Sequence, residues 1–267
     1  MSTFHTGFSS LGADGYETEL DRGGEYGFDF VELTMNDYPA AELDANADRI
    51  RSLAREHGLD LIVHLPHGGR DAMIGSTDDR VREKSIQQFA AAIEAAGSIG
   101  AGKAVLHADS SDELLLAEAG RFDELYTAVE ELAEVANEND VELCVENMLG
   151  RKRRRLSPRD VVRVAERTGA SMTFDTGHAR TMGYDDEAAA SFLREHADVV
   201  SHFHLNDTRG PSDEHLPFGA GTIDFETILG SLPADWEGTL TMEISTPSYD
   251  YVEFSHRKLL CTLKRIE

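Results

Sequence analysis

Cysteine is scarce in this sequence, with two among 267 residues, which excludes the disulfide framework of a small secreted protein. Cys144 lies in an apolar run and Cys261 in a helical pattern, and we expect both to be core residues. No apolar run approaches the roughly 18 residues of a membrane span, and the first residues lack a basic segment followed by an apolar one. These absences predict a cytoplasmic protein without a membrane partner.

Positive charge is scarce as well. Lysine and arginine together number 25 against 50 acidic residues, which gives a net charge of −25, and only five of the cations are lysines. Concentrated salt would screen this self-repulsion, so we interpret the composition as that of a halophilic protein, with an ordinary acidic enzyme as the alternative. Because the same field repels phosphate backbones, nucleic acid is a less favoured partner than a small molecule.

The chain does contain a regular alternation of short β-rich runs and longer amphipathic segments, which is typical of βα units around a parallel sheet. The predicted strands are Thr3–Phe8, Phe28–Leu33, Leu59–Leu65, Lys103–His107, Val141–Glu146, Ser171–Asp175, Val199–Leu205 and Thr239–Ile244. The predicted helices are Ala41–His57, Asp78–Ile99, Phe122–Asn139, Pro158–Thr168, Asp186–Glu195, Asp224–Leu229 and Tyr251–Lys264. We interpret Ser9–Glu25, which is polar and has no clear period, as a long loop with at most one short helix.

Eight such units fit one closed (β/α)₈ TIM barrel, which we predict as a single domain over residues 1–267. A doubly wound sheet is the alternative architecture. With 40% hydrophobic residues and no biased tract, the chain can bury a sizeable core, which excludes a disordered or fibrous protein.

Imidazole and carboxylate groups recur where the predicted strands end. They are His64, His107, Glu146, Asp175, His178, His204, Asp213, His215 and Glu243. Because all strands of a parallel barrel end at one face, we expect these side chains to be neighbours. Buried carboxylates repel one another unless a cation neutralises them, and divalent ions such as zinc take these ligand types. The pattern predicts a metal site.

These residues resemble the superfamily of xylose isomerase-like barrels, which includes sugar isomerases, epimerases and endonuclease IV, and the resemblance covers nearly the whole chain. It implies that Glu146, Asp175, His204 and Glu243 bind one divalent cation, as in the isomerases and epimerases. Endonuclease IV holds a three-zinc cluster, whose other ligand positions are filled here by His64, His107, His178, Asp213 and His215. The resemblance therefore implies one to three ions, with zinc or manganese as the metal.

Other motifs favour the small-sugar branch of that superfamily. Gly27-Phe-Asp-Phe-Val-Glu32 resembles the isomerase pattern in which a glutamate ends the second strand, so Glu32 is a candidate substrate contact, with a surface or capping residue as the alternative. The loop from His215 to Phe225 resembles one common among sugar phosphate isomerases, although Asp213 is less typical of them. No segment resembles the basic and aromatic wedge that endonuclease IV inserts into duplex DNA.

Three further features bear on the substrate. His67, just past the third strand, is either a loop residue or a substrate contact. The basic run Arg151-Lys-Arg-Arg-Arg155, with Arg153, Arg154 and Arg155 as candidate contacts, suits a phosphate group or a solvated surface equally. Gly219-Ala-Gly221 fits either a phosphate-binding turn or, more simply, a tight turn.

The resemblance favours a metal-dependent isomerase or epimerase acting on a small sugar or sugar phosphate. In this hypothesis Glu146 and Glu243 move the proton and His178 orients substrate oxygens. The alternative is a trinuclear zinc phosphoesterase like endonuclease IV, an AP endonuclease, in which metal ions activate water and stabilise the phosphoryl transition state. A third hypothesis is a metal-stabilised binding protein without turnover.

Overall fold

The computed structural model describes residues 4–12, 14–67, 73–76, 78–108, 122–149, 156–210 and 212–266. Eight parallel strands, each hydrogen-bonded to the next, close into a barrel when β8 pairs with β1. The strands are β1 (Phe4–Ser9), β2 (Phe30–Thr34), β3 (Asp60–His64), β4 (Lys103–Leu106), β5 (Glu142–Glu146), β6 (Ser171–Asp175), β7 (Val200–Leu205) and β8 (Gly238–Met242). The predicted (β/α)₈ TIM barrel is confirmed.

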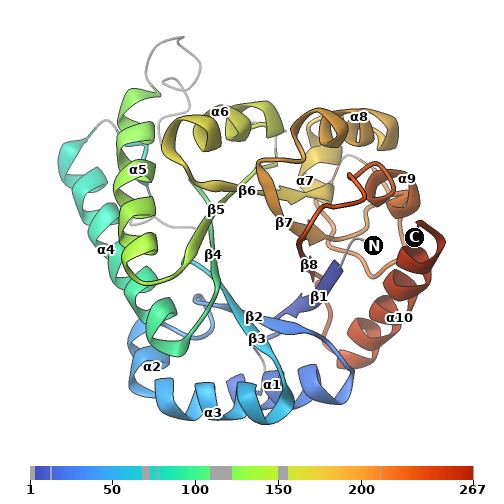
Figure 1. Ribbon diagram of the computed structural model, residues 1–267, viewed down its shortest axis with the longest axis horizontal. Helices are drawn as coiled ribbons and strands as arrows, with labels where there is room; N and C mark the ends of the chain where they lie inside the picture. The colour runs from blue at the N-terminus through green and yellow to red at the C-terminus, as the bar shows by residue number, and fades with distance from the viewer. Residues whose placement is uncertain are drawn as a thin grey trace.

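Helices surround this barrel, as Figure 1 shows, and most of the hydrophobic core lies between them and the strands. The helices are α1 (Tyr16–Glu25), α2 (Ala40–Ala45), α3 (Ala47–His57), α4 (Asp79–Ile99), α5 (Asp123–Glu138), α6 (Pro158–Thr168), α7 (Thr176–Thr181), α8 (Asp186–His196), α9 (Phe225–Leu229) and α10 (Tyr249–Ile266). The last helix, α10, packs beside β1 and β8, which brings the two ends of the chain to the same side of the barrel (Figure 1). In the described part of the chain, no helix is long and apolar enough to cross a membrane.

Local signals set the limits of these elements. In α6, Ser157 accepts a hydrogen bond from the backbone of Asp160, and the Asp160 carboxylate accepts one from the backbone of Ser157, which closes a capping box. Pro158 occupies the first turn, where its missing N–H costs nothing, and Gly169 ends the helix at a φ of 74°. The strand that follows can therefore start two residues later and run back through the barrel.

The barrel interior is apolar at one level and polar two residues further on. Phe30, Ile62 and Val105 form a small cluster inside the barrel. Side chains two positions apart on a strand point the same way, so Glu32, His64 and His107 project inward above that cluster. The strand ends of the sequence pattern thus become a polar layer at the carboxyl-terminal mouth.

Two predictions about the elements were wrong, and a third, a long loop with at most one short helix over Ser9–Glu25, was right only in part. Ser9–Glu25 contains the ten-residue helix α1, because its buried positions 16, 19, 20 and 23 have helical spacing but include a glutamate and a glycine, which hides the apolar pattern. The single helix expected over Ala41–His57 is broken at Asn46 into α2 and α3. Cys144 is buried as expected, whereas Cys261 is exposed, because it lines an open groove beside α10.

We expect the barrel to need salt. The net charge of −25 leaves repulsion that only counterions relieve, so the melting temperature should rise by roughly 10 °C or more between dilute buffer and molar KCl. Thermal melting followed by circular dichroism across a KCl series checks this. A melting temperature that is independent of salt would contradict the halophilic interpretation.

Candidate metal centre

All nine predicted ligands lie within the described residues, and the fold brings them to one mouth of the barrel. His64, Glu146 and Asp175 are the last residues of β3, β5 and β6, and His204 is the penultimate residue of β7. His107 and Glu243 directly follow β4 and β8. His178 lies in α7, and Asp213 and His215 lie in the loop after β7. These side chains form three groups, and within each group the ligand atoms lie within 4.8 Å of one another.

The first group consists of Glu146, Asp175, His204 and Glu243. Nδ1 of His204 lies 3.5 Å from Oε2 of Glu146 and 3.4 Å from Oε2 of Glu243. Asp175 is fully buried, and its Oδ1 accepts a 2.5 Å hydrogen bond from the backbone N–H of His178 at the start of α7. Three carboxylates and one imidazole nitrogen therefore surround a single position.

The second group consists of His64, His107 and Glu146, so Glu146 belongs to two groups. Nε2 of His107 lies 2.9 Å and Nε2 of His64 lies 3.5 Å from Oε2 of Glu146. Nδ1 of His64 donates to the carbonyl of Leu65 at 2.9 Å, which leaves its Nε2 lone pair facing His107 and Glu146.

The third group consists of His178, Asp213 and His215. Nε2 of His178 lies 3.4 Å and Nε2 of His215 lies 3.0 Å from the carboxylate of Asp213. The opposite ring nitrogens donate to backbone carbonyls, His178 to Asn147 at 3.0 Å and His215 to Glu243 at 3.1 Å. His215 also has a φ of 46°, a strained conformation for a residue with a side chain, and such strain is concentrated at functional sites.

The donor set fits a divalent cation. Nδ1 of His204 and Oε2 of Glu243 are buried without a hydrogen-bond partner. Oε1 of Glu146 and Oδ1 of Asp213 each have an imidazole nitrogen 3.0 Å away, from His178 and His215, but in a geometry that makes no hydrogen bond. Burial, together with the charges of Glu146 and Glu243, raises the pKa of Asp175 to about 7 even though His178 lies beside it. A cation among these atoms would satisfy them and offset the repulsion, and imidazole with carboxylate suits zinc or manganese.

The loop that carries Asp213 and His215 is held by a residue to which the sequence analysis assigned no role. The buried carboxylate of Asp207 accepts hydrogen bonds from the backbone N–H groups of Gly219, Gly221 and Ile223 at 2.8–3.0 Å. These donors are therefore engaged, and the simpler interpretation of Gly219-Ala-Gly221 as a tight turn is confirmed. A Cβ at Gly221 would approach the backbone of Thr208 to 2.5 Å, which explains the glycine.

The candidate substrate contacts lie at different places relative to the ligand groups. His67 lies beside the second group, with its ring centre 4.9 Å from that of His64. Burial, together with the charges of His64 and His107, lowers the pKa of His67 to about 4. Glu32 is fully buried, accepts a hydrogen bond from His204 and forms a fourth group with His64 and His204, whose ligand atoms also lie within 4.8 Å of one another. Its role as a substrate contact stays a prediction. Arg153, Arg154 and Arg155 lie outside the described residues.

A cavity of about 190 Å³ opens beside the ligands. Its walls include His64, His67, His215 and Glu243. They also include the hydroxyl-bearing residues Ser9, Ser10, Thr34 and Ser245. The polar groups in its walls suit a small molecule with several hydroxyl groups.

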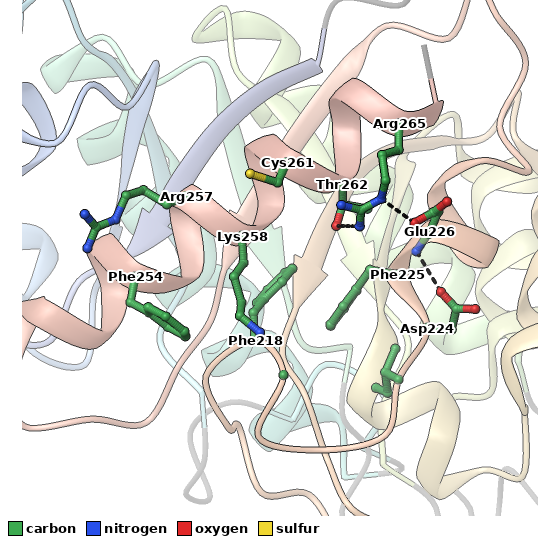
Figure 2. A pocket seen from close by; sticks show the side chains of 12 residues that line it. Phe218, Asp224, Phe225, Glu226, Phe254, Arg257, Lys258, Cys261, Thr262 and Arg265 are labelled. Atoms are coloured by element: carbon green, nitrogen blue, oxygen red, sulfur yellow. Dashed lines mark hydrogen bonds and ion pairs between the residues drawn. The ribbon is translucent and has the colours of Figure 1, made fainter.

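A larger groove, of about 580 Å³, lies away from these ligands, between α10 and the segment that leads into α9. Figure 2 shows its aromatic side chains Phe218, Phe225 and Phe254, with Lys258 and Cys261 projecting from α10. None of the nine candidate ligands lines it. Its size alone does not make it the functional site.

Together the barrel and the nine side chains define a TIM barrel whose mouth carries clusters of side chains that could hold a metal ion. The chain belongs to the xylose isomerase-like TIM barrel family, whose model matches residues 20–260. It is similar to the uncharacterized protein MJ1311 of Methanocaldococcus jannaschii, with 26% identity over an alignment of 209 residues that covers 74% of this chain and 69% of that protein.

Solved structures with the same fold include a D-tagatose 3-epimerase-like protein, with a TM-score of 0.82, 24% identity and 98% of both chains covered. A D-psicose 3-epimerase crystallised in the presence of D-fructose has a TM-score of 0.76 and 17% identity, over 98% of this chain and 99% of that one. At these identities the likeness establishes the fold over the whole chain and leaves the chemistry to the site.

Proposed function

We propose that this protein is a divalent-metal-dependent isomerase or epimerase of a small sugar or sugar phosphate. The observation that carries the proposal is the convergence of Glu146, Asp175, His204 and Glu243 beside the small hydroxyl-lined cavity. The named sugar epimerases that share this fold over nearly their whole length support the same class.

In the proposed reaction, metal binding, proton transfer and substrate binding fall to different residues. A divalent ion held by Glu146, Asp175, His204 and Glu243 would supply Lewis acidity for a carbonyl and its neighbouring hydroxyl. Glu146 and Glu243 lie 3.5 and 3.4 Å from Nδ1 of His204, so they flank the same position. There one carboxylate would remove a proton from carbon and the other, in its protonated form, would deliver a proton to carbon. We assign the hydroxyls of Ser10 and Ser245, in the cavity wall, to bind substrate hydroxyl groups. In this proposal His178 orients a substrate oxygen.

A second candidate function, a trinuclear zinc phosphoesterase, is favoured by one specific observation. The five further ligands complete two additional groups, and Glu146 is shared between the first and the second. Adjacent metal ions stabilise the attacking and leaving oxygens in phosphoester hydrolysis. Against it stands the charge of −25, which repels the phosphate backbone of a duplex.

The double variant Asp213→Ala with His215→Ala separates the two functions. An isomerase needs only the ion on the first group, so we expect this variant to keep that metal and its kcat while KM for the sugar changes. The measurements are metal content by mass spectrometry and turnover on ketoses, sugar phosphates and an abasic-site duplex in molar KCl.

The matched control is Asp21→Ala with His57→Ala, which removes an aspartate–histidine pair 2.9 Å apart on the surface. It should change neither metal content nor turnover. Three metals in the wild-type protein, two in the test variant and loss of phosphodiester cleavage would establish the phosphoesterase instead. Bound metal with no turnover on any substrate of the panel would leave a binding protein.

A further inference from the structure

Glu32 lies at the centre of a buried hydrogen-bonded cluster beneath the first ligand group. Its Oε1 accepts from Nε2 of His204 at 3.1 Å, and its Oε2 accepts from Nε2 of His202 at 3.1 Å and from the hydroxyl of Thr241 at 2.6 Å. All four side chains are fully buried. Three donors therefore meet the two oxygens of one carboxylate.

This geometry determines which nitrogen of His204 faces the ligands. Because Nε2 donates to Glu32, the proton of the neutral ring is on Nε2 and the lone pair is on Nδ1. Nδ1 is the atom that lies 3.4 Å from Glu243 and 3.5 Å from Glu146, and it has no hydrogen-bond partner of its own. A metal-ligating histidine whose other ring nitrogen donates to a carboxylate is fixed in both tautomer and orientation.

The cluster also holds Glu32 in place. The carboxylate of Glu32 can only accept, so Nε2 of His202 donates to it, and Nδ1 of the neutral His202 ring, 2.6 Å from the hydroxyl of Thr239, is the acceptor. Thr241 supplies a second donor to the same oxygen. With these partners on β7 and β8, the carboxylate on β2 cannot turn toward the mouth without leaving buried donors unpaired.

We propose that Glu32 is the positioning residue of the metal centre, which holds His204 with Nδ1 available as a ligand, and that it does not contact substrate. The inference rests on the metal dependence proposed above and deepens it, since it assigns to the strand 2 glutamate a role in metal affinity. It also explains why a carboxylate lies in the barrel interior beneath the site.

Glu32→Gln is the direct test, because an amide has one acceptor oxygen and one NH₂ group. If the amide oxygen of the new glutamine accepts from His202 and Thr241, its NH₂ group faces Nε2 of His204. An NH₂ group donates, so it favours the His204 tautomer that has its proton on Nδ1. In Co²⁺ titrations of the metal-free protein in molar KCl, followed by visible absorption, we expect one equivalent to bind about 10- to 100-fold more weakly.

Three threonine variants test the inference independently of any folding defect in Glu32→Gln. Thr241→Val removes the donor to Glu32 at nearly constant volume and should also weaken that equivalent, and Thr241→Ser should restore it. Thr173→Val is the control, because Thr173 is equally buried inside the barrel and its hydroxyl has no partner. We expect Thr173→Val to bind Co²⁺ as the wild type does.

Wild-type Co²⁺ affinity in both Glu32→Gln and Thr241→Val would overturn the inference, whatever the activity of the protein. Because the titration uses no substrate, it is independent of turnover. Glu32-dependent metal binding in a protein that acts on no sugar would overturn the proposed function and leave the inference standing.

Discussion

Replacing Glu146 with glutamine is expected to abolish turnover while the barrel stays folded. Glu146 is fully buried and is the one residue shared by the first and second ligand groups, so its charge serves both. The change removes a metal ligand and a proton carrier at almost constant shape, and we expect kcat/KM to fall roughly 10³-fold or more. Kinetics on the substrate identified by the sugar panel measure the loss, and circular dichroism reports the fold.

Glu142→Gln is the matched control for this variant. Glu142 is at the other end of the same strand, where it pairs with Lys103 and accepts a hydrogen bond from Ser171. Its replacement should lower stability through the loss of that ion pair and leave kcat unchanged. Full activity of Glu146→Gln, or equal loss in both variants, would contradict the assigned site.

Removing bound metal is expected to lower the melting temperature by roughly 10 °C. Without a cation, Glu146, Asp175 and Glu243 repel one another in a buried site, and a ligand that binds only the folded state contributes about 4 kcal/mol at a thousand times its Kd. Differential scanning fluorimetry at constant KCl, before chelation, after it and after return of Zn²⁺ or Mn²⁺, measures the effect.

The same titration on Glu146→Gln provides the comparison, since the variant should gain much less stability from the returned metal. Stabilisation by Mg²⁺ to the same extent as by Zn²⁺ would indicate a site without preference for imidazole ligands. A wild-type melting temperature that stays the same after chelation and after return of the metal would show that these carboxylates need no cation.

The site could be predicted as far as it depends on strand ends. His64, Glu146 and Asp175 terminate runs that are apolar enough to be identified as buried strands, and a parallel barrel places all such ends at one mouth. The bounds and length of helix α1 could not be predicted, because its buried face includes Glu19. The Glu19 carboxylate accepts hydrogen bonds from the backbone N–H groups of Leu11 and Gly12 and from the hydroxyl of Tyr38. A hydropathy pattern cannot identify a buried helix face whose polar side chain is hydrogen-bonded to residues distant in the sequence.

The sequence by itself determined the eight βα units, the family and the nine candidate ligands. Each follows from local patterns, namely the alternation of β-rich runs with amphipathic segments and the residues at the ends of the strands. Only the tertiary structure decided how those ligands divide into three groups, that Glu146 belongs to two of them, and that Glu32 is hydrogen-bonded to His204. These facts depend on the stagger between strands that are distant in the chain, such as β2 and β7. Stagger follows from the closure of the whole barrel, and no local segment encodes it.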